Sequence, residues 1–233
     1  LLHSLTDAET RFDDLLLSPD DAVAQAMAHR GPKPVVIADA QDNPGAGAAS
    51  DTTGVLSALI KGNAQGAVLA ILNDPDIAAL AHDLGIGKEF SAMLGGKSGQ
   101  AEQVPFSGRF RVEALSDGRF PFSGAMYKGM TASLGPMAVL RILDTPADIH
   151  VVIGSVRCQC LDLAIFTHLG IDPARQRVIV VKSSVHFRGD FEPISDTILV
   201  VEAPGAHPCR LDHINYRNLR PGVRLGPGGQ ANE

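Results

Sequence analysis

Residues 35–53 contain an apolar run, a polar loop with two glycines and the start of an amphipathic pattern, in that order. The run at 35–38 is typical of a buried strand. Pro-Gly-Ala-Gly at 44–47 interrupts regular structure, and glycine lets the backbone approach a ligand closely. Asp-Thr-Thr at 51–53 offers helix-capping residues before apolar side chains at helical spacing. The stretch predicts a strand, a glycine loop and a helix, and ligands bind at such junctions in open α/β sheets.

Three polar residues, Asp39, Asp42 and Asn43, follow the predicted strand directly. An ordinary strand-to-helix turn, with Asp51 as the helix cap, would account for any one of them. Two carboxylates, an amide and a glycine pair in so short a segment favour a ligand-binding loop. This loop is therefore the first candidate for a functional site.

Strand-like and helix-like segments alternate over most of the chain. The other short apolar runs that predict buried strands are 67–72, 149–153, 178–181 and 198–201. A Ser-Pro pair at 18–19 and an Asp-Pro pair at 74–75 predict helix starts, and further helices are expected after residue 53 and around 163–170. This alternation predicts an α/β fold, in which helices flank a mainly parallel sheet with right-handed crossovers.

Residues 88–145 break this alternation. Their short runs, such as 109–115 and 131–142, favour strands that have one solvent-exposed face. We expect this region to insert antiparallel hairpins beside the parallel strands. Gly-Gly-Lys-Ser at 95–98 resembles the end of a phosphate-binding loop but lacks the earlier glycine, so a flexible hairpin tip is the better interpretation.

The composition excludes several classes of protein. Hydrophobic residues make up 45% and charged residues 20% of the 233 residues, as in soluble globular proteins. The formal charge of −6, with no run of Lys or Arg, predicts neither a nucleic-acid partner nor a membrane surface. No apolar run approaches the roughly 18 residues of a membrane span. Three cysteines argue against a disulfide framework and for a reducing, cytoplasmic location, and Cys158-Gln-Cys160 lacks zinc-finger spacing.

Polar clusters follow three of the predicted strands, at 39–43, 155–159 and 182–188. Because the carboxyl ends of parallel strands share one edge of a sheet, we expect these clusters to converge. Asp42 could act as an acid, a base or a metal ligand, and Asn43 could donate to an oxyanion. The basic candidates, which could clamp an anionic group or titrate near neutral pH, are Arg157, Lys182, His186 and Arg188.

Blander and rival interpretations of these residues stay open. Lys182 and Arg188 could simply pair with Asp190 and Glu192, and a lone histidine is often structural. A dinucleotide site is disfavoured, because Ser50 replaces the third glycine of the fingerprint and extra residues separate the strand from the glycines. The alternative function is a small-anion or nucleotide-binding α/β module without hydrolytic chemistry.

The segment Asp42-Asn-Pro-Gly-Ala-Gly47, followed by Asp-Thr-Thr at 51–53, resembles a motif of the C-terminal domain of microcystinase C (MlrC)-like proteins. Further blocks at 95–97, 182–188 and 200–205 resemble that family in the same order. The resemblance covers residues 18–224. One departure is Ala49-Ser50, where the family commonly has Pro-Gly, and the tail after Arg224 lacks the usual Pro-Leu-Asp.

The resemblance implies a two-domain zinc metallopeptidase or related hydrolase, whose named activity is on linear microcystin peptides. Family members carry the zinc ligands in an N-terminal domain, so we expect no metal ligands here and no hydrolytic activity from this chain alone. The implied partners are that metal-binding domain and a peptide-like substrate. The resemblance carries over the Asp42-Asn43-Pro44 loop, which would face the zinc cleft and contact the substrate. Taken together with the strand-end clusters, the predicted site residues are Asp42 and Asn43 for catalysis and Pro44, Gly45, Gly47, Arg157, Lys182, His186 and Arg188 for substrate binding.

The resemblance also implies domain boundaries. Residues 1–30 would be a linker and leading helix from the missing N-terminal domain, and residues 31–225 would be the C-terminal α/β domain. The glycine-rich segment 226–233 is expected to be a mobile tail. Because the chain does not begin with Met, we expect a fragment or a processed product.

Overall fold

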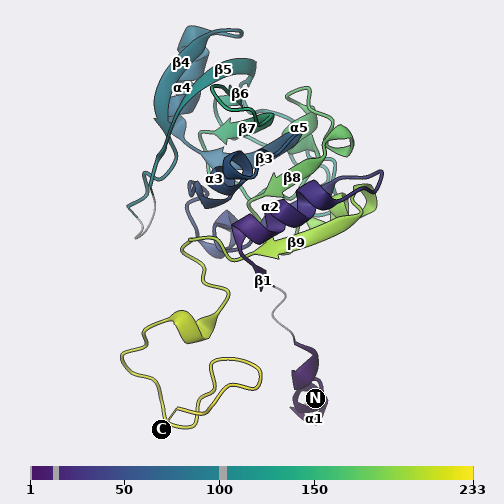
Figure 1. Ribbon diagram of the computed structural model, residues 1–233, viewed down its shortest axis with the longest axis vertical. Coiled ribbons are helices and arrows are strands. Elements are labelled where there is room, and N and C mark those ends of the chain that lie inside the picture. The colour runs from purple at the N-terminus through teal and green to yellow at the C-terminus, as the bar shows by residue number, and fades with distance from the viewer. Residues whose placement is uncertain (1, 13–15, 100–103, 233) are drawn as a thin grey trace.

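The computed structural model describes residues 2–12, 16–99 and 104–232. Residues 1 and 13–15 of the predicted leading segment, 100–103 of the predicted hairpin region and 233 of the predicted tail lie outside this description. The described strands form a single nine-stranded sheet in the order β1-β9-β2-β8-β3-β7-β6-β5-β4 (Figure 1).

The strands in chain order are β1 (Leu16–Leu17), β2 (Val35–Asp39), β3 (Ala67–Asn73), β4 (Glu89–Leu94), β5 (Phe106–Ser116), β6 (Met137–Ile142), β7 (Ile149–Gly154), β8 (Val178–Val181) and β9 (Thr197–Val201). The α-helices are α1 (Leu2–Asp7), α2 (Pro19–Ala28), α3 (Gly54–Lys61), α4 (Pro75–Leu84), α5 (Ala164–Thr167) and α6 (Arg188–Phe191). The short 3-10 turns are η1 (Glu9–Arg11), η2 (Pro44–Ala46), η3 (Pro173–Arg175), η4 (Glu192–Ile194) and η5 (Leu211–His213).

The sheet is parallel from β1 to β7 and antiparallel from β7 to β4. The predicted α/β class is therefore confirmed, and the antiparallel part comes from the region predicted to insert it. All five predicted parallel strands are present, as β2, β3, β7, β8 and β9.

Helices cover both faces of the parallel strands. Side chains of α2, α3 and α4 pack with Val35 and Ile37 on one face, whereas α5, α6 and the segment 120–134 pack with Val36 and Ala38 on the other. Successive side chains of a strand point to opposite faces, so a strand covered on both sides has no solvent-exposed face on which polar side chains would alternate with apolar ones. This is why β2 and β8 appear in the sequence as continuous apolar runs.

Two helix starts have the caps that the sequence predicts. The Ser18 side chain accepts from the backbone N–H of Asp21 before α2, and Asp74 accepts from Ile77 N before α4. In both helices proline occupies the first turn, where its missing N–H costs nothing. Gly85 caps the carboxyl end of α4.

Two predicted elements are shorter than expected. The helix predicted around 163–170 is the four-residue α5, and the strand predicted at 131–142 begins only at Met137. Gly135 has a φ of +66°, and Pro136 follows it without a backbone donor, so the chain cannot extend β6 backwards. Thr131 instead forms an isolated bridge with Pro121.

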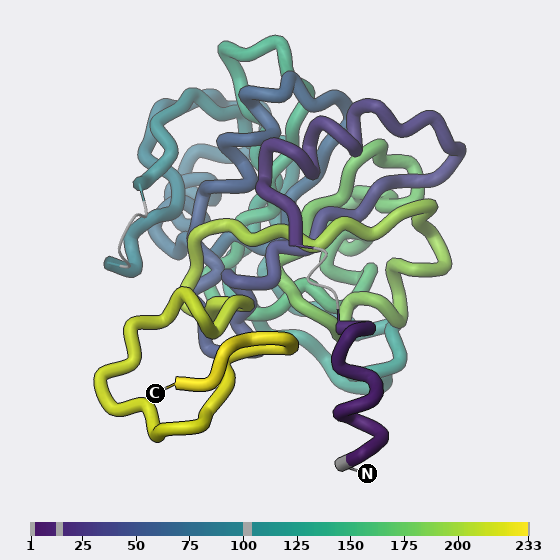
Figure 2. The backbone as a smooth tube through the Cα atoms, turned by 60° about the horizontal axis from the view of Figure 1, so that its bottom comes forward, coloured from purple at the N-terminus to yellow at the C-terminus, as the bar shows by residue number. Residues whose placement is uncertain are grey.

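Both terminal segments extend away from the sheet on the same side of the molecule (Figures 1 and 2). They meet where Glu9 pairs with Arg224 at 2.5 Å and accepts from the backbone N–H of Gly228. The mobility predicted for the tail stays a prediction. None of the described helices is long and apolar enough to cross a membrane.

Candidate functional site

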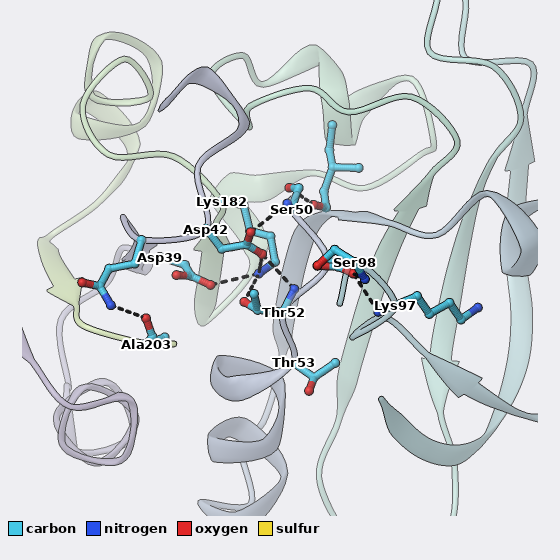
Figure 3. Close-up of polar contacts among 12 residues, drawn as sticks. Asp39, Asp42, Ser50, Thr52, Thr53, Lys97, Ser98, Lys182 and Ala203 are labelled. Atoms are coloured by element: carbon cyan, nitrogen blue, oxygen red, sulfur yellow. Dashed lines mark hydrogen bonds and ion pairs between the residues drawn. The ribbon is translucent and has the colours of Figure 1, made fainter. Parts of the chain in front are cut away.

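The loop after β2 is built around the ammonium group of Lys182, which follows β8. Lys182 Nζ donates to Asp39 Oδ2 at 2.9 Å, to Asp42 Oδ2 at 2.7 Å and to Thr52 Oγ1 at 3.0 Å. Figure 3 shows the ammonium group between these three acceptors. All four residues are completely buried. Because β2 and β8 are neighbours in the parallel sheet, their carboxyl ends bring this cation into the loop.

The cluster holds two carboxylates against one cation away from water. Burial acts to lower the pKa of Lys182, but the charges and hydrogen bonds of Asp39 and Asp42 outweigh it and raise that pKa above its usual value. Burial raises the pKa of Asp39, and the attraction of Lys182 opposes this only in part. Asp39 Oδ1 has no hydrogen-bond partner among the described residues. The cluster is thus the main buried charge of the domain, and it depends on Lys182.

Asp42 closes the loop by bonding its far end. Its Oδ1 accepts from Ser50 N at 2.7 Å, and its Oδ2 accepts from Thr52 N at 2.8 Å in addition to Lys182. Asp42 and Lys182 are predicted to act on or bind a substrate, and this stays a prediction; both side chains are fully buried and their polar atoms are engaged inside the loop. Both residues are placed to hold the loop in shape.

Gln41 ties the loop to the segment after β9. Its side chain donates to Ala203 O at 2.5 Å and accepts from Cys209 N at 2.8 Å. Gly205 lies against the same backbone, where an added Cβ would come within 2.3 Å of Gln41 O. A glycine at 205 is therefore needed for this close approach.

Asp51 ties the loop to the β4–β5 hairpin and does not cap α3, as the sequence had suggested. Asp51 Oδ2 accepts from Lys97 N at 2.8 Å and from Ser98 N at 2.7 Å, and Oδ1 accepts from Ser98 Oγ at 2.9 Å. Thr53 occupies the cap position, but its hydroxyl donates to Val104 O. Gly95 has a φ of +62°, and a Cβ added there would lie 2.4 Å from Asp51 O. Glycine at this position therefore allows the hairpin tip to approach the loop backbone closely.

The exposed part of the loop is Gly45, Ala46 and Gly47, in and just after η2. Asn43 is 3% exposed and supports this tip from below. Its Oδ1 accepts from Gly45 N at 2.9 Å, and its Nδ2 donates to Ser184 Oγ at 2.9 Å. The loop therefore presents a rigid, nearly side-chain-free surface at the carboxyl edge of the sheet, with Pro44 half-buried at its base.

The three predicted polar clusters meet at this edge. Gln159, in the segment after β7, is 8% exposed, and its Oε1 lies 3.1 Å from His186 Nδ1. The same amide lies over Gly45, because an added Cβ there would be 2.7 Å from Oε1. His186 itself is exposed. Gln159 was not singled out in the sequence, although it stands between two cysteines at a strand end.

The two remaining basic candidates differ in their environments. Arg188 pairs with Glu192 at 2.9 Å and lies over the Phe187 ring, which agrees with the blander interpretation of this residue. Arg157 is exposed and, among the described residues, has no hydrogen-bond or ion-pair partner. Of the four basic candidates, it is the one without a partner among the residues that the structure describes.

No group of three or more His, Cys, Asp and Glu side chains in the described ranges is placed to hold a metal ion. Burial raises the pKa of the Cys158 thiol to about 11 and that of Cys160 well above its usual value, so neither offers a thiolate at neutral pH. The described residues therefore form no metal site of their own.

Comparisons with known proteins match most of the chain. The family model described as MlrC C-terminus matches residues 37–218. Microcystinase C from Sphingomonas sp is 27% identical over 188 residues, which are 81% of this chain and 36% of that protein. The crystal structure of a protein named "Putative metallopeptidase" from Mesorhizobium sp. BNC1 has a TM-score of 0.77 at 21% identity, covering 93% of this chain and 42% of that chain. The structural likeness shows the fold, and this chain spans well under half of either relative.

Proposed function

The chain belongs to the MlrC C-terminal domain family, and from this we propose that it is the substrate-facing domain of an MlrC-like metallopeptidase or related hydrolase acting on peptide or amide bonds. The printed names of the two relatives, Microcystinase C and a metallopeptidase, support this class of reaction. The sequence blocks at 95–97, 182–188 and 200–205 surround the 39–53 loop, which agrees with a common role.

The observation that carries the proposal is the exposed glycine tip at 45–47, which Asn43 holds from below and against which the Gln159 amide packs, next to His186. A site needs side chains whose positions are set by packing and hydrogen bonds below them. Lys182 and Asp42 hold the loop through their hydrogen bonds, and Asn43 bonds the backbone of the tip at Gly45. In this proposal Asp42, Asn43 and Lys182 position the site, while Pro44, Gly45 and Gly47 form the surface that meets the substrate.

We assign the basic side chains different roles toward a peptide-like substrate. Arg157, which has no partner within the described residues, would bind a carboxylate of the substrate with its planar guanidinium group. Arg188 would contribute less, because Glu192 already neutralises it. His186 would contact the substrate near the bond that is cleaved.

The metal of such an enzyme would be held by polypeptide outside this chain. We infer zinc and an N-terminal metal-binding domain from the family resemblance, and the described residues offer no competing site. The small, odd number of cysteines agrees with a reducing compartment, and we infer a cytoplasmic location.

The test uses the full polypeptide that contains this chain, with linear peptides as substrates. Arg157→Ala should lower kcat/KM about tenfold or more, because a charge-assisted hydrogen bond contributes about 1.5–3 kcal/mol. Arg175→Ala is the matched control, since Arg175 is also exposed but precedes β8 at the opposite edge of the sheet. Equal kinetics for the two variants, or no hydrolysis of amide bonds by the metal-loaded enzyme, would refute the proposal.

The absence of a partner for Arg157 also favours a second candidate, a module that binds a small anion without chemistry. In that case this chain by itself should bind a small dicarboxylate, and Arg157→Ala should abolish the binding heat in calorimetry. Amide hydrolysis by the full polypeptide, lost in the site variants, would decide against the binding module.

A further inference from the structure

We propose that Gln159 is a positioning residue that fixes the ring of His186, so that Nε2 of the imidazole faces the site and carries a proton during amide hydrolysis. The proton-carrying role rests on the proposed function, whereas the fixed ring is a property of this chain alone.

The contact between the two side chains sets which ring nitrogen is protonated. Gln159 Oε1 lies 3.1 Å from His186 Nδ1. With the amide in this orientation its oxygen accepts, and Nδ1 carries the hydrogen of this bond. A neutral imidazole has one N–H, and its Nε2 is then left with a lone pair. Because His186 is exposed, this lone pair is available to a molecule at the sheet edge.

The amide of Gln159 is itself held from two sides. An added Cβ on Gly45 would lie 2.7 Å from Gln159 Oε1 and 2.9 Å from its Cδ, so the amide packs directly on the glycine tip. The next residue, Cys160, donates its N–H to Lys182 O at 3.2 Å, which ties this segment to the end of β8. Phe187, completely buried, anchors the histidine from the other side. The pair is therefore built on packed backbone.

No other group in the described part of the chain competes for the His186 ring. The charged or titratable groups on the surrounding segments are Asp42, Arg157, Cys158, Cys160, Asp162, Lys182, Arg188, Asp190 and Glu192. Asp42 is paired with Lys182, and Asp162 accepts from Ser123 Oγ and Gly124 N. Within the described ranges, none of these carboxylates bonds to His186. Within the described part of the chain, Gln159 is therefore the group that selects the tautomer of this ring.

The proposed step follows from the needs of the leaving group. In amide hydrolysis the oxygen of water adds to the carbonyl carbon and that water releases a proton to solvent; the C–N bond then breaks, and its electron pair goes to nitrogen. That nitrogen must gain a proton. A protonated His186 gives its Nε2 proton to the nitrogen, keeps its Nδ1–H on Gln159, and regains a proton from solvent. A general acid placed in this way typically contributes about 10²–10⁴-fold to the rate.

The first experiment measures the tautomer directly, without any activity. Long-range ¹H–¹⁵N spectra of this chain, labelled with ¹⁵N-histidine, should show His186 as the Nδ1–H form when neutral. Gln159→Met should remove that preference. His168 is the internal control, because its Nδ1 lies 2.7 Å from Ala164 O, and it should keep its Nδ1–H in both proteins. An Nε2–H form of His186 in the wild-type chain would overturn the inference.

The second experiment measures catalysis in the full polypeptide, with the melting temperature of each variant as a check on folding. His186→Asn should lower kcat about 100-fold or more. Gln159→Met should lower kcat about tenfold with little change in KM, since the ring is misplaced and not lost. Gln159→Glu should retain activity and move the alkaline fall of the pH–rate profile upward, because a carboxylate stabilises the protonated imidazole.

Gly189→Ala serves as the control for the segment, because an added Cβ there meets nothing within 4 Å. An unchanged kcat in His186→Asn, or an unchanged pH profile in Gln159→Glu, would overturn the proton-carrying role. If Arg157→Ala is defective while His186→Asn is not, the proposed function survives and this inference fails. If neither variant is defective, both fail.

Discussion

Replacing Lys182 with Met should destabilise the domain strongly, because it removes the cation from a buried cluster and keeps most of its volume. Lys182 donates to Asp39, Asp42 and Thr52, and all four residues have no exposed surface. Breaking a buried ion pair by removing one partner costs about 3–5 kcal/mol, because the other charge is left uncompensated. For a chain of this length 1 kcal/mol shifts Tm by about 2–4 °C, so the expected fall is about 6–20 °C.

The loss should depend on pH in a way that a packing defect would not. The pKa of Asp39 is raised by burial, so between its ordinary value of 3.8 and the raised value the folded state binds more protons than the unfolded state. Stability from this group therefore increases as pH falls through that window. Without Lys182, the attraction that lowers the pKa of Asp39 is lost, so its raised pKa moves further from the ordinary value and the pH window becomes wider. The deficit of Lys182→Met relative to wild type should then be smaller at about pH 5 than at about pH 8.

Urea denaturation at the two pH values, followed by circular dichroism, would measure these differences. Adding Asp39→Asn to Lys182→Met should recover about 1–3 kcal/mol, because an uncompensated carboxylate is removed. Lys61→Met is the control, since Lys61 pairs with Asp20 on the surface, where an ion pair contributes about 0–1 kcal/mol. A Lys182→Met deficit as small as that of Lys61→Met, and constant with pH, would refute this account of the cluster.

Three further predictions follow from single contacts around the loop. Ser50 has a φ of +62°, and its hydroxyl donates to Ile71 O. Both Ser50→Gly and Ser50→Ala lose this bond, but only glycine adopts this φ without strain, so Ser50→Gly should be about 1 kcal/mol more stable than Ser50→Ala in chemical denaturation. The reverse order of stability would contradict backbone strain at this position. Asp51→Ala should speed amide hydrogen exchange at Lys97 and Ser98 and leave α3 unchanged; faster exchange in the first turn of α3 would restore its role as a cap. Equilibrium dialysis of this chain should find no stoichiometric zinc, and a tightly bound ion would require ligands not recognised here.

The lysine cluster and the contacts of Asp42 and Asp51 show the same point: a local sequence pattern does not predict which group a carboxylate will bond. A carboxylate after a strand could face a ligand, cap the next helix or bond another loop, and its residue type fits all three. The choice depends on which donor lies nearest in space. For Asp42 the donors are two backbone N–H groups of its own loop and the side chain of Lys182, 140 positions later. For Asp51 they include backbone N–H groups 46 and 47 positions later.

The sequence by itself determined the elements whose causes are local. Continuous apolar runs predicted β2 and β8 because both faces of these strands are covered, and Ser18 and Asp74 predicted helix starts because a cap needs only the next turn. Only the tertiary structure placed β8 between β2 and β3. That order buries Lys182 against Asp42 and brings Gln159 onto His186 and Gly45, because strand pairing joins segments whose sequence separation carries no periodic signal.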